Sequence, residues 1–258
     1  MTIQISIIKI ESYGPWTLTL GADRESDLQM LQAQIYHDLQ KFFSDKNCLV
    51  FFNRFDEYFA LTNQLSVKEH INILKKFSKK HYNLKLSISI GTGKTPFAAN
   101  IDAYNARTLH NLINRTFSIY GTLSPLDHNN NNDKNMKILH VDIDNSSHMA
   151  SGLSPYEITS IIMKLYTRLI ENFLQYDSLT FFLGGDNFMI VTPIDLKQQN
   201  VDIILKHISN DLNISLNCGI GIGTNGKNTA KAATLSLDTI RKLRKTGKIV
   251  NIFESKCI

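Results

Sequence analysis

The chain contains an internal repeat, and this feature limits its possible folds more than any other. Moving the first half forward by 130 positions places residues 51–62 on residues 181–192 without a gap, and an apolar series at helical spacing precedes both segments. Residues 88–92 match residues 220–224 after a small slip. Solenoid repeats are only about 20–50 residues long, so this repeat predicts two similar domains.

Each half is expected to contain a strand, a helix, a β-hairpin, a helix, a strand and a helix. In the second half these are predicted as a strand at 137–143, a helix starting at Ser154-Pro155, a hairpin within 181–192, a helix near 196–211, a strand near 214–221 and a helix near 229–246. This βαββαβ order predicts an α+β fold: two tandem ferredoxin-like domains, each an antiparallel sheet with helices packed on one face. An Asn-rich linker at 121–135 would separate a domain at 1–120 from a domain at 136–258.

Composition restricts the class of protein. An apolar fraction of 43% can fill two cores, and the net charge of +5 suits a polyphosphate ligand, although it is also common without an acidic partner. Cys48, Cys218 and Cys257 are far apart and form no CxxC pair, which indicates a reduced, cytoplasmic chain without a zinc knuckle. No apolar stretch is long enough to span a bilayer, and the N-terminus lacks the features of a signal peptide. We therefore expect neither a membrane nor a nucleic acid as a partner.

The hairpin of the second half carries the strongest chemical signal. Gly184 and Gly185 permit a tight turn and a close approach by a phosphate, and Asp186 follows them directly. A second carboxylate, Asp142, lies on the preceding apolar strand, which neighbours the hairpin in this fold. Two carboxylates in one space repel each other unless a cation lies between them. The pair therefore suggests a nucleoside triphosphate held through Mg²⁺.

Residues around Asp142 have competing interpretations. Strand alternation places His140, Asp142 and Asp144 on one face. Asp144 could be a further metal ligand, or it could form a polar turn with Asn145 and the following serine. His140 could act as an acid or base, although a single histidine on a strand is more often satisfied by its neighbours.

Several motifs together resemble the archaeal GTP cyclohydrolase III family. They are Tyr13-Gly14-Pro15-Trp16-Thr17, Arg24-Glu25-Ser26-Asp27-Leu28-Gln29, Arg54-Phe55-Asp56 and Phe182-Leu183-Gly184-Gly185-Asp186-Asn187-Phe188-Met189. The Val-Asp-Ile-Asp and Gly-Gly-Asp-Asn segments also resemble the palm of nucleotidyl and diguanylate cyclases. The cyclohydrolase resemblance implies hydrolysis of GTP to a formylamino-pyrimidine nucleotide monophosphate and two phosphates, for flavin or deazaflavin cofactors. It further implies Mg²⁺ and stimulation by a monovalent cation such as K⁺, and we expect no zinc.

The candidate site follows from these motifs. As catalytic residues we expect Asp142, Asp186 and Asn187, and as metal ligands Asp142, the Ile143 carbonyl, Asp144 and Asp186. As substrate contacts we expect Gly184, Gly185, Asn145, Arg241, Arg244, Lys248, Tyr13 and Trp16. Basic residues near the end of the last helix contact the triphosphate in palm-type cyclases, but such a cluster is also common on a solvated helix face. The two aromatic residues could stack on guanine, or could pack in the core beside a plain turn.

The first repeat differs where the chemistry would be. Lys9 stands opposite Asp142, Glu11 opposite Asp144, and Arg54-Phe55 opposite Gly184-Gly185. A lysine cannot replace a metal-binding carboxylate, so the metal–triphosphate site is expected in the second half. The first half is then a degenerate copy that could supply partner surface, base contacts or a second, weaker site. The rival functions are a nucleotidyl or diguanylate cyclase and a non-catalytic GTP sensor. Self-association as a homodimer or homotetramer is also expected.

Overall fold

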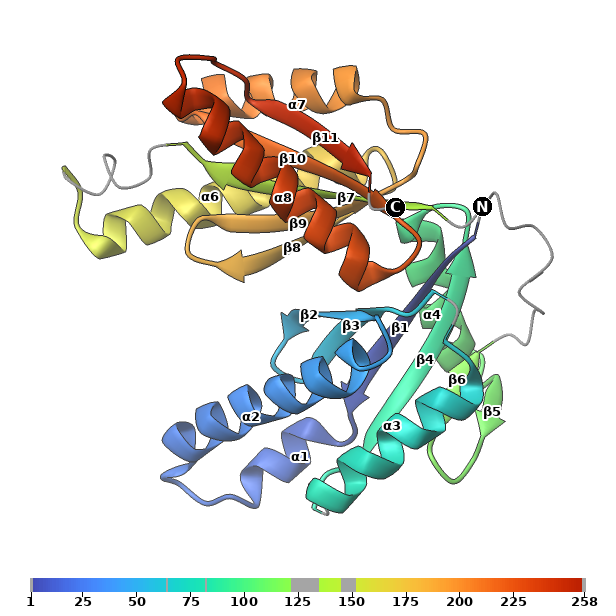
Figure 1. Cartoon of the computed structure of the whole chain (residues 1–258). Helices are drawn as coiled ribbons and strands as arrows, with labels where there is room; N and C mark the ends of the chain where they lie inside the picture. Colours follow the sequence, from blue (N-terminus) through green and yellow to red (C-terminus); the bar gives the residue numbers. More distant parts are fainter. Residues whose placement is uncertain (1, 64, 82, 122–134, 145–151, 257–258) are drawn as a thin grey trace. The chain divides into compact units, whose positions relative to one another are not determined.

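The computed structural model describes residues 2–63, 65–81, 83–121, 135–144 and 152–256 (Figure 1). Backbone contacts divide the chain into two compact units: residues 2–93 with 98–129, and residue 1 with 94–97 and 130–258. The boundaries 1–120, 121–135 and 136–258 stay a prediction, because most of the proposed linker lies outside the described residues. We refer to the two units as the first and the second unit.

Both units contain the elements that the repeat predicts. The first unit consists of β1 (Ile3–Ile10), α1 (Tyr13–Leu18), α2 (Arg24–Ser44), β2 (Leu49–Arg54), β3 (Glu57–Leu61), α3 (Val67–Lys80), β4 (Leu86–Gly93), α4 (Pro96–Thr108), β5 (Leu112–Asn114) and β6 (Ile119–Gly121). The second consists of β7 (Met136–Ile143), α6 (Pro155–Leu174), β8 (Leu179–Gly184), β9 (Asn187–Thr192), α7 (Gln198–Leu212), β10 (Leu216–Gly223), α8 (Gly226–Lys245) and β11 (Ile252–Lys256). The predicted start of the helix after Ser154 is confirmed, because Ser154 and Glu157 form a capping box.

The sheets are mixed rather than antiparallel. Their strand orders are β2-β3-β1-β4-β6-β5 and β11-β10-β7-β9-β8. The four strands of each predicted βαββαβ repeat do pair antiparallel, but β6 joins β4 in parallel and β11 joins β10 in parallel. The prediction of antiparallel sheets was wrong because each unit continues beyond its last helix. A chain that returns through a helix to the same sheet edge arrives parallel to the strand it left.

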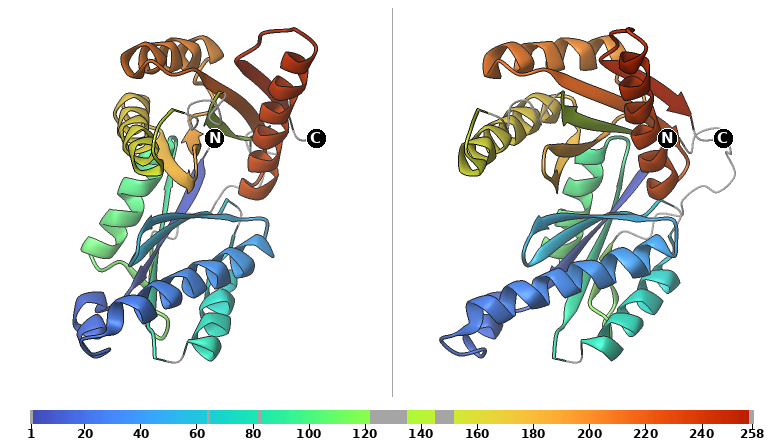
Figure 2. Two further views of the ribbon diagram at one scale, coloured as in Figure 1. Left: turned by 90° about the vertical axis from the view of Figure 1, so that its left-hand side faces the viewer. Right: turned by 60° about the vertical axis from the view of Figure 1, so that its left-hand side comes forward.

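Helices cover both faces of each sheet, so the prediction of helices on one face was also wrong. In the second unit, Val141 and Ile143 point into a core shared with α6 and α7, whereas His140 contacts Thr234 of α8 on the opposite face. Figures 1 and 2 show α8 on the other side of its sheet from α6 and α7. The glycines of β10 permit this packing, since a Cβ on Gly221 would lie 2.3 Å from backbone atoms of α8.

The glycines also correct the repeat alignment. Gly91 fits against Ala99 and Ala103 of α4 as Gly221 fits against Thr229 and Ala233 of α8. Leu86 pairs with Ile10 as Leu216 pairs with Ile143. The fourth strand of each repeat is therefore related by the original shift, and the expected slip was wrong. The slipped alignment matched residues 88–92 with 220–224 because both contain Ile and Gly, but these residues do not occupy equivalent positions in the two sheets.

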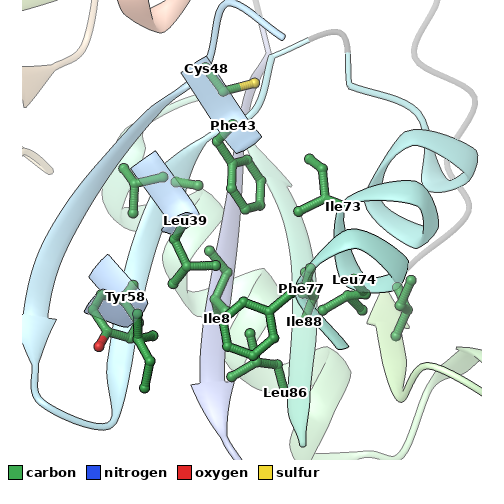
Figure 3. Close-up of a cluster of buried hydrophobic side chains, with 14 of the residues drawn as sticks. Ile8, Leu39, Phe43, Cys48, Tyr58, Ile73, Leu74, Phe77, Leu86 and Ile88 are labelled. Carbon is green, nitrogen blue, oxygen red and sulfur yellow. The ribbon is translucent and has the colours of Figure 1, made fainter. Parts of the chain in front are cut away.

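The core of the first unit lies between its sheet and helices α2 and α3 (Figure 3). Ile8, Leu39, Phe43 and Phe77 are fully buried there. Each such side chain contributes about 1.5–3 kcal/mol by leaving water. Because this core and its counterpart hold the strands rigidly, the opposite face of each sheet can carry polar groups.

Acidification is expected to destabilise the first unit through His70. This side chain is fully buried against Ser6, and burial lowers its pKa to about 4. The unfolded chain takes up the proton first, so stability is lost as the pH falls from about 6.5 towards 4. We expect a loss of about 2 kcal/mol between pH 7 and pH 5, measured by urea unfolding with the fluorescence of Trp16. The His70→Gln variant should lose this dependence and the exposed-histidine control His37→Gln should keep it; equal pH slopes in both would contradict the prediction.

Candidate active site

The candidate site lies on the α8 face of the second sheet. The period of β7 directs His140 and Asp142 to this face, and Asp144 follows directly after the strand. The β8–β9 hairpin, next to β7 in the sheet, supplies Asp186 and Asn187 at its turn. Segments more than forty residues apart in the chain thus meet at one end of neighbouring strands.

Asp142 is buried and only half satisfied. The residue is only 3% exposed, and its Oδ2 accepts a hydrogen bond of 2.6 Å from Arg241. Its Oδ1 is buried and has no hydrogen-bond partner among the described residues. Burial raises the pKa of Asp142, Arg241 opposes this shift, and the nearby charge of Asp186 adds to it. The two carboxylates are therefore close enough for their charges to interact, and one buried oxygen of Asp142 is left available.

The Ile143 carbonyl faces the same space. The amide of Asp144 donates to the Ser215 carbonyl at 2.8 Å, next to the pair of Ile143 with Leu216. Hydrogen-bonded positions alternate along an antiparallel strand, so Ile143 directs its own N–H and C=O away from β10 and towards the hairpin side. β9 pairs with β7 only as far as Val141. This carbonyl lies beyond the end of that ladder.

The glycine turn has its predicted conformation. Gly184 and Gly185 have φ values of +107° and +61°. Residues with a Cβ atom rarely adopt such positive φ values, because the Cβ atom makes them sterically unfavourable. An added Cβ would meet nothing within 4 Å at Gly184 and only the Asn187 amide at Gly185. Glycine is therefore required here by backbone geometry, and the space above the turn is open.

A hydrogen-bonded chain positions Asp186. His140 Nε2 and Asn187 Oδ1 are 3.1 Å apart, and Asn187 Nδ2 donates to Asp186 Oδ1 at 2.9 Å. The other ring nitrogen, Nδ1, lies 3.1 Å from Thr234 Oγ1. Burial lowers the pKa of His140, which favours the neutral ring. Because the Asn187 Oδ1 atom can only accept a hydrogen bond, the ring proton is assigned to Nε2. Both nitrogens are occupied, so His140 orients Asn187 and Asp186.

Replacing His140 by phenylalanine is expected to lower turnover about tenfold, the effect of losing one positioning hydrogen bond. The pH profile of kcat should keep its shape, because His140 exchanges no proton with substrate in this arrangement. Steady-state kinetics between pH 5.5 and 8.5 measure both quantities. Loss of one limb of the profile would show instead that His140 is an acid or base.

The basic residues of α8 contact the carboxylates of β7. Besides Asp142, Arg241 contacts Asp238 at 3.1 Å. Arg244 bonds Asp144 and donates to Asn217 at 2.9 Å. These arginines neutralise the acidic edge, and about half of the Arg241 side chain remains exposed.

No described contact joins the other expected residues to this site. Lys248 is exposed beyond the end of α8. Tyr13 and Trp16 belong to α1 of the first unit, where they pack against its core 5.8 Å apart and Tyr13 bonds Gln32. Their stacking on guanine stays a prediction. Asn145 lies outside the described residues.

Sequence reasoning missed three residues that orient this site, namely Asn217, Thr234 and Asp238. Asn217 lies on the same face of β10 as Gly219 and Gly221. This alternation could have indicated from the sequence that Asn217 faces the helix packed on the glycines. Thr234 and Asp238 lie one helical turn apart on α8 and could be found only after that helix was placed over β7.

The described residues contain no group of three or more His, Cys, Asp and Glu side chains that could hold a metal ion. Asp142 and Asp186 with the Ile143 carbonyl still offer three oxygen ligands. Mg²⁺ is commonly held by one or two carboxylates while phosphate and water complete its shell. The unpartnered Oδ1 of Asp142 fits such an ion.

The fold and the site together place an open glycine turn beside two carboxylates, an arrangement that can accommodate a phosphate-bearing ligand. The family model for GTP cyclohydrolase III matches residues 3–254, and the chain belongs to this family. GTP cyclohydrolase III of Methanobrevibacter smithii is 33% identical over 245 residues, which cover 93% of this chain and 94% of that protein. The Methanothermobacter thermautotrophicus protein of the same name is 32% identical over 246 residues, covering 93% and 94%.

Among solved structures, the GGEEF domain of a diguanylate cyclase from Vibrio cholerae is similar to part of the chain. It has a TM-score of 0.37 at 14% identity and covers 47% of this chain and 85% of its own. In the part of the chain that is described, no helix has the length and apolar character needed to cross a membrane.

Proposed function

We propose that this chain hydrolyses GTP, opening the imidazole ring to give 2-amino-5-formylamino-6-(5-phospho-ribosylamino)pyrimidin-4(3H)-one and two phosphates. Membership of the GTP cyclohydrolase III family over residues 3–254 supports the reaction. The observation that carries the site is the unpartnered, buried Oδ1 of Asp142 beside Asp186 and the open glycine turn. We also propose a tandem palm-type fold, supported by the same strand order in both four-strand repeats.

In this proposal Asp142, Asp186 and the Ile143 carbonyl hold Mg²⁺. When bound, the ion would neutralise the triphosphate and polarise it for attack by water. Gly184 and Gly185 let the phosphates approach the backbone. Asn187 holds the Asp186 carboxylate in place, and His140 holds Asn187.

Arg241 has a second role in this proposal. It pairs with Asp142 in the present structure, and its exposed half can turn towards a phosphate when a cation takes over the neutralisation of Asp142. Arg244 is less exposed and stays tied to Asp144 and Asn217, which fixes the end of α8 over the site. In this proposal Arg241 moves to contact a phosphate, whereas Arg244 has a structural role.

The cofactors, compartment and assembly remain proposals. We propose stimulation by a monovalent cation such as K⁺, and a role in supplying flavin or deazaflavin cofactors. A cytoplasmic location is supported by Cys48 and Cys218, which are buried and unbonded, with burial raising the pKa of both thiols. Homo-oligomerisation can be measured by light scattering coupled to gel filtration.

Incubation with GTP and Mg²⁺ tests the function. Phosphate release, the ultraviolet spectrum and product mass are followed together, and we expect two phosphates per ring-opened monophosphate. A cyclic nucleotide with pyrophosphate would instead identify a cyclase, and bound but unchanged GTP would identify a sensor.

Removal of zinc is expected to leave turnover intact. A zinc-selective chelator should have no effect while Mg²⁺ is present, because the proposed ligands are oxygens, which magnesium prefers over zinc's usual nitrogen and sulfur donors. EDTA should abolish turnover and added Mg²⁺ should restore it. Restoration by zinc alone would contradict the proposed metal.

A further inference from the structure

The first unit contains a cavity at the place that corresponds to the candidate active site. Its volume is about 790 Å³, within the range of small-molecule sites, and it is lined by residues of β1, β2, β3, β4, α4 and β6, together with Glu11 and His110. It lies on the α4 face of the first sheet, as the candidate site lies on the α8 face of the second. Lys9, opposite Asp142 in the repeat, and Glu57, opposite Asn187, both line it.

The acidic groups of this cavity already have partners. Glu11 accepts a hydrogen bond of 2.7 Å from Arg107, which also donates to Ser87 at 2.7 Å. This reproduces the Arg244 contact with Asp144 and Asn217 in the second unit. Glu57 pairs with Arg54 at 3.1 Å. Neither carboxylate is left to attract a metal ion.

Lys9 is a charged residue of the cavity lining for which no partner is described. It is half-buried in the cavity wall, and among the described residues it forms no hydrogen bond or ion pair. An ammonium group removed from part of its hydration favours an anion. In the second unit the same sheet position carries the carboxylate of Asp142, so the substitution reverses the charge that this face presents.

Aromatic rings lie in the same cavity. Tyr104 of α4 is 59% exposed although it lines the cavity, and Tyr120 lies on β6 with Arg107 5.9 Å from its ring centre. Aromatic side chains can stack on a base while neighbouring cations contact its phosphate. An inorganic anion has no base on which Tyr104 could stack, so the exposed ring favours a nucleotide as the ligand.

We propose that this cavity binds a mononucleotide without a divalent cation. Lys9 contacts the phosphate, and Tyr104 stacks on the base. The lining residues of this cavity all belong to the first unit, and none of them is among the residues to which the proposed hydrolysis of GTP assigns a role, so the proposal does not depend on that reaction. The duplicated fold would then carry one carboxylate site for a metal-bound triphosphate and one cationic site for a metal-free nucleotide.

Equilibrium dialysis of the full chain with labelled GMP in EDTA tests the proposal. We expect saturable binding that Lys9→Gln weakens at least about tenfold, as expected for a lost charge-assisted contact, and that Tyr104→Ala also weakens at least about fivefold. Lys68→Gln, an exposed lysine on α3, is the matched control and should bind as the wild type does. Asp186→Asn should also leave this binding unchanged, whatever it does to GTP turnover.

Three results would overturn the proposal. They are absence of GMP binding in EDTA, binding that both cavity variants leave unchanged, and equal losses in Lys9→Gln and Lys68→Gln. Competition separates the possible anions: inorganic phosphate that displaces GMP at equal concentration would contradict the stacking role of Tyr104. Guanosine that binds as tightly as GMP would contradict the phosphate contact of Lys9.

Discussion

Asp186→Asn is expected to lower the turnover of GTP at least about 100-fold, since a metal-held triphosphate gains several kcal/mol of stabilisation. The variant keeps the size of the side chain and the contact with Asn187 while it removes the charge beside Asp142. Phosphate release at saturating Mg²⁺ measures the effect. Because Asp186 is only partly buried at a turn, the stability of the fold should change little.

The repeat provides a matched control for this variant. Asp56 occupies the corresponding turn of the first unit, where Arg54 lies 3.8 Å from it and Lys9 replaces the second carboxylate. Asp56→Asn should therefore keep most of the activity. Equal losses in both variants would show that the two hairpins contribute alike, and full activity of Asp186→Asn would exclude a metal site at the second hairpin.

Gly219→Ala is expected to destabilise the second unit by about 3 kcal/mol and to abolish activity with it, as overpacking at a rigid contact costs roughly 1–3 kcal/mol. A Cβ at this position would lie 2.1 Å from the Ala233 carbonyl oxygen and 2.5 Å from the Leu237 amide. Both atoms belong to the backbone of α8 and cannot move without the helix. Since α8 carries Arg241 and Arg244, its displacement also opens the site.

Gly152→Ala is the control for this substitution, because its Cβ would meet nothing within 4 Å. Urea unfolding followed by circular dichroism compares the two variants. The single tryptophan, Trp16, belongs to the first unit, so its fluorescence should report an unchanged transition in Gly219→Ala. Equal stability of both variants would mean that α8 does not pack closely on β10.

The parts of the candidate site that depend on local sequence patterns could be predicted. Strand alternation placed His140 and Asp142 on one face, and the Gly184-Gly185 pair required the observed turn. The partners of these groups were not predictable. Arg241 was expected to contact substrate, but its guanidinium also lies 2.6 Å from Asp142, and the distance in sequence is 99 residues. No local preference specifies such a contact.

The sequence by itself determined the duplication, the order of elements in each half and the two carboxylates of the second half, Asp142 and Asp186, because periodicity and turn chemistry act between near neighbours. Tertiary structure decided which faces the helices cover and how the sheet edges are completed. Gly219 and Gly91 show why: each is an ordinary strand residue in the sequence, and its meaning appears only when the backbone of α8 or α4 lies against it. Tertiary structure also decided that Lys9, which replaces a carboxylate in the repeat, lines a cavity, because burial and contacts depend on the assembled unit.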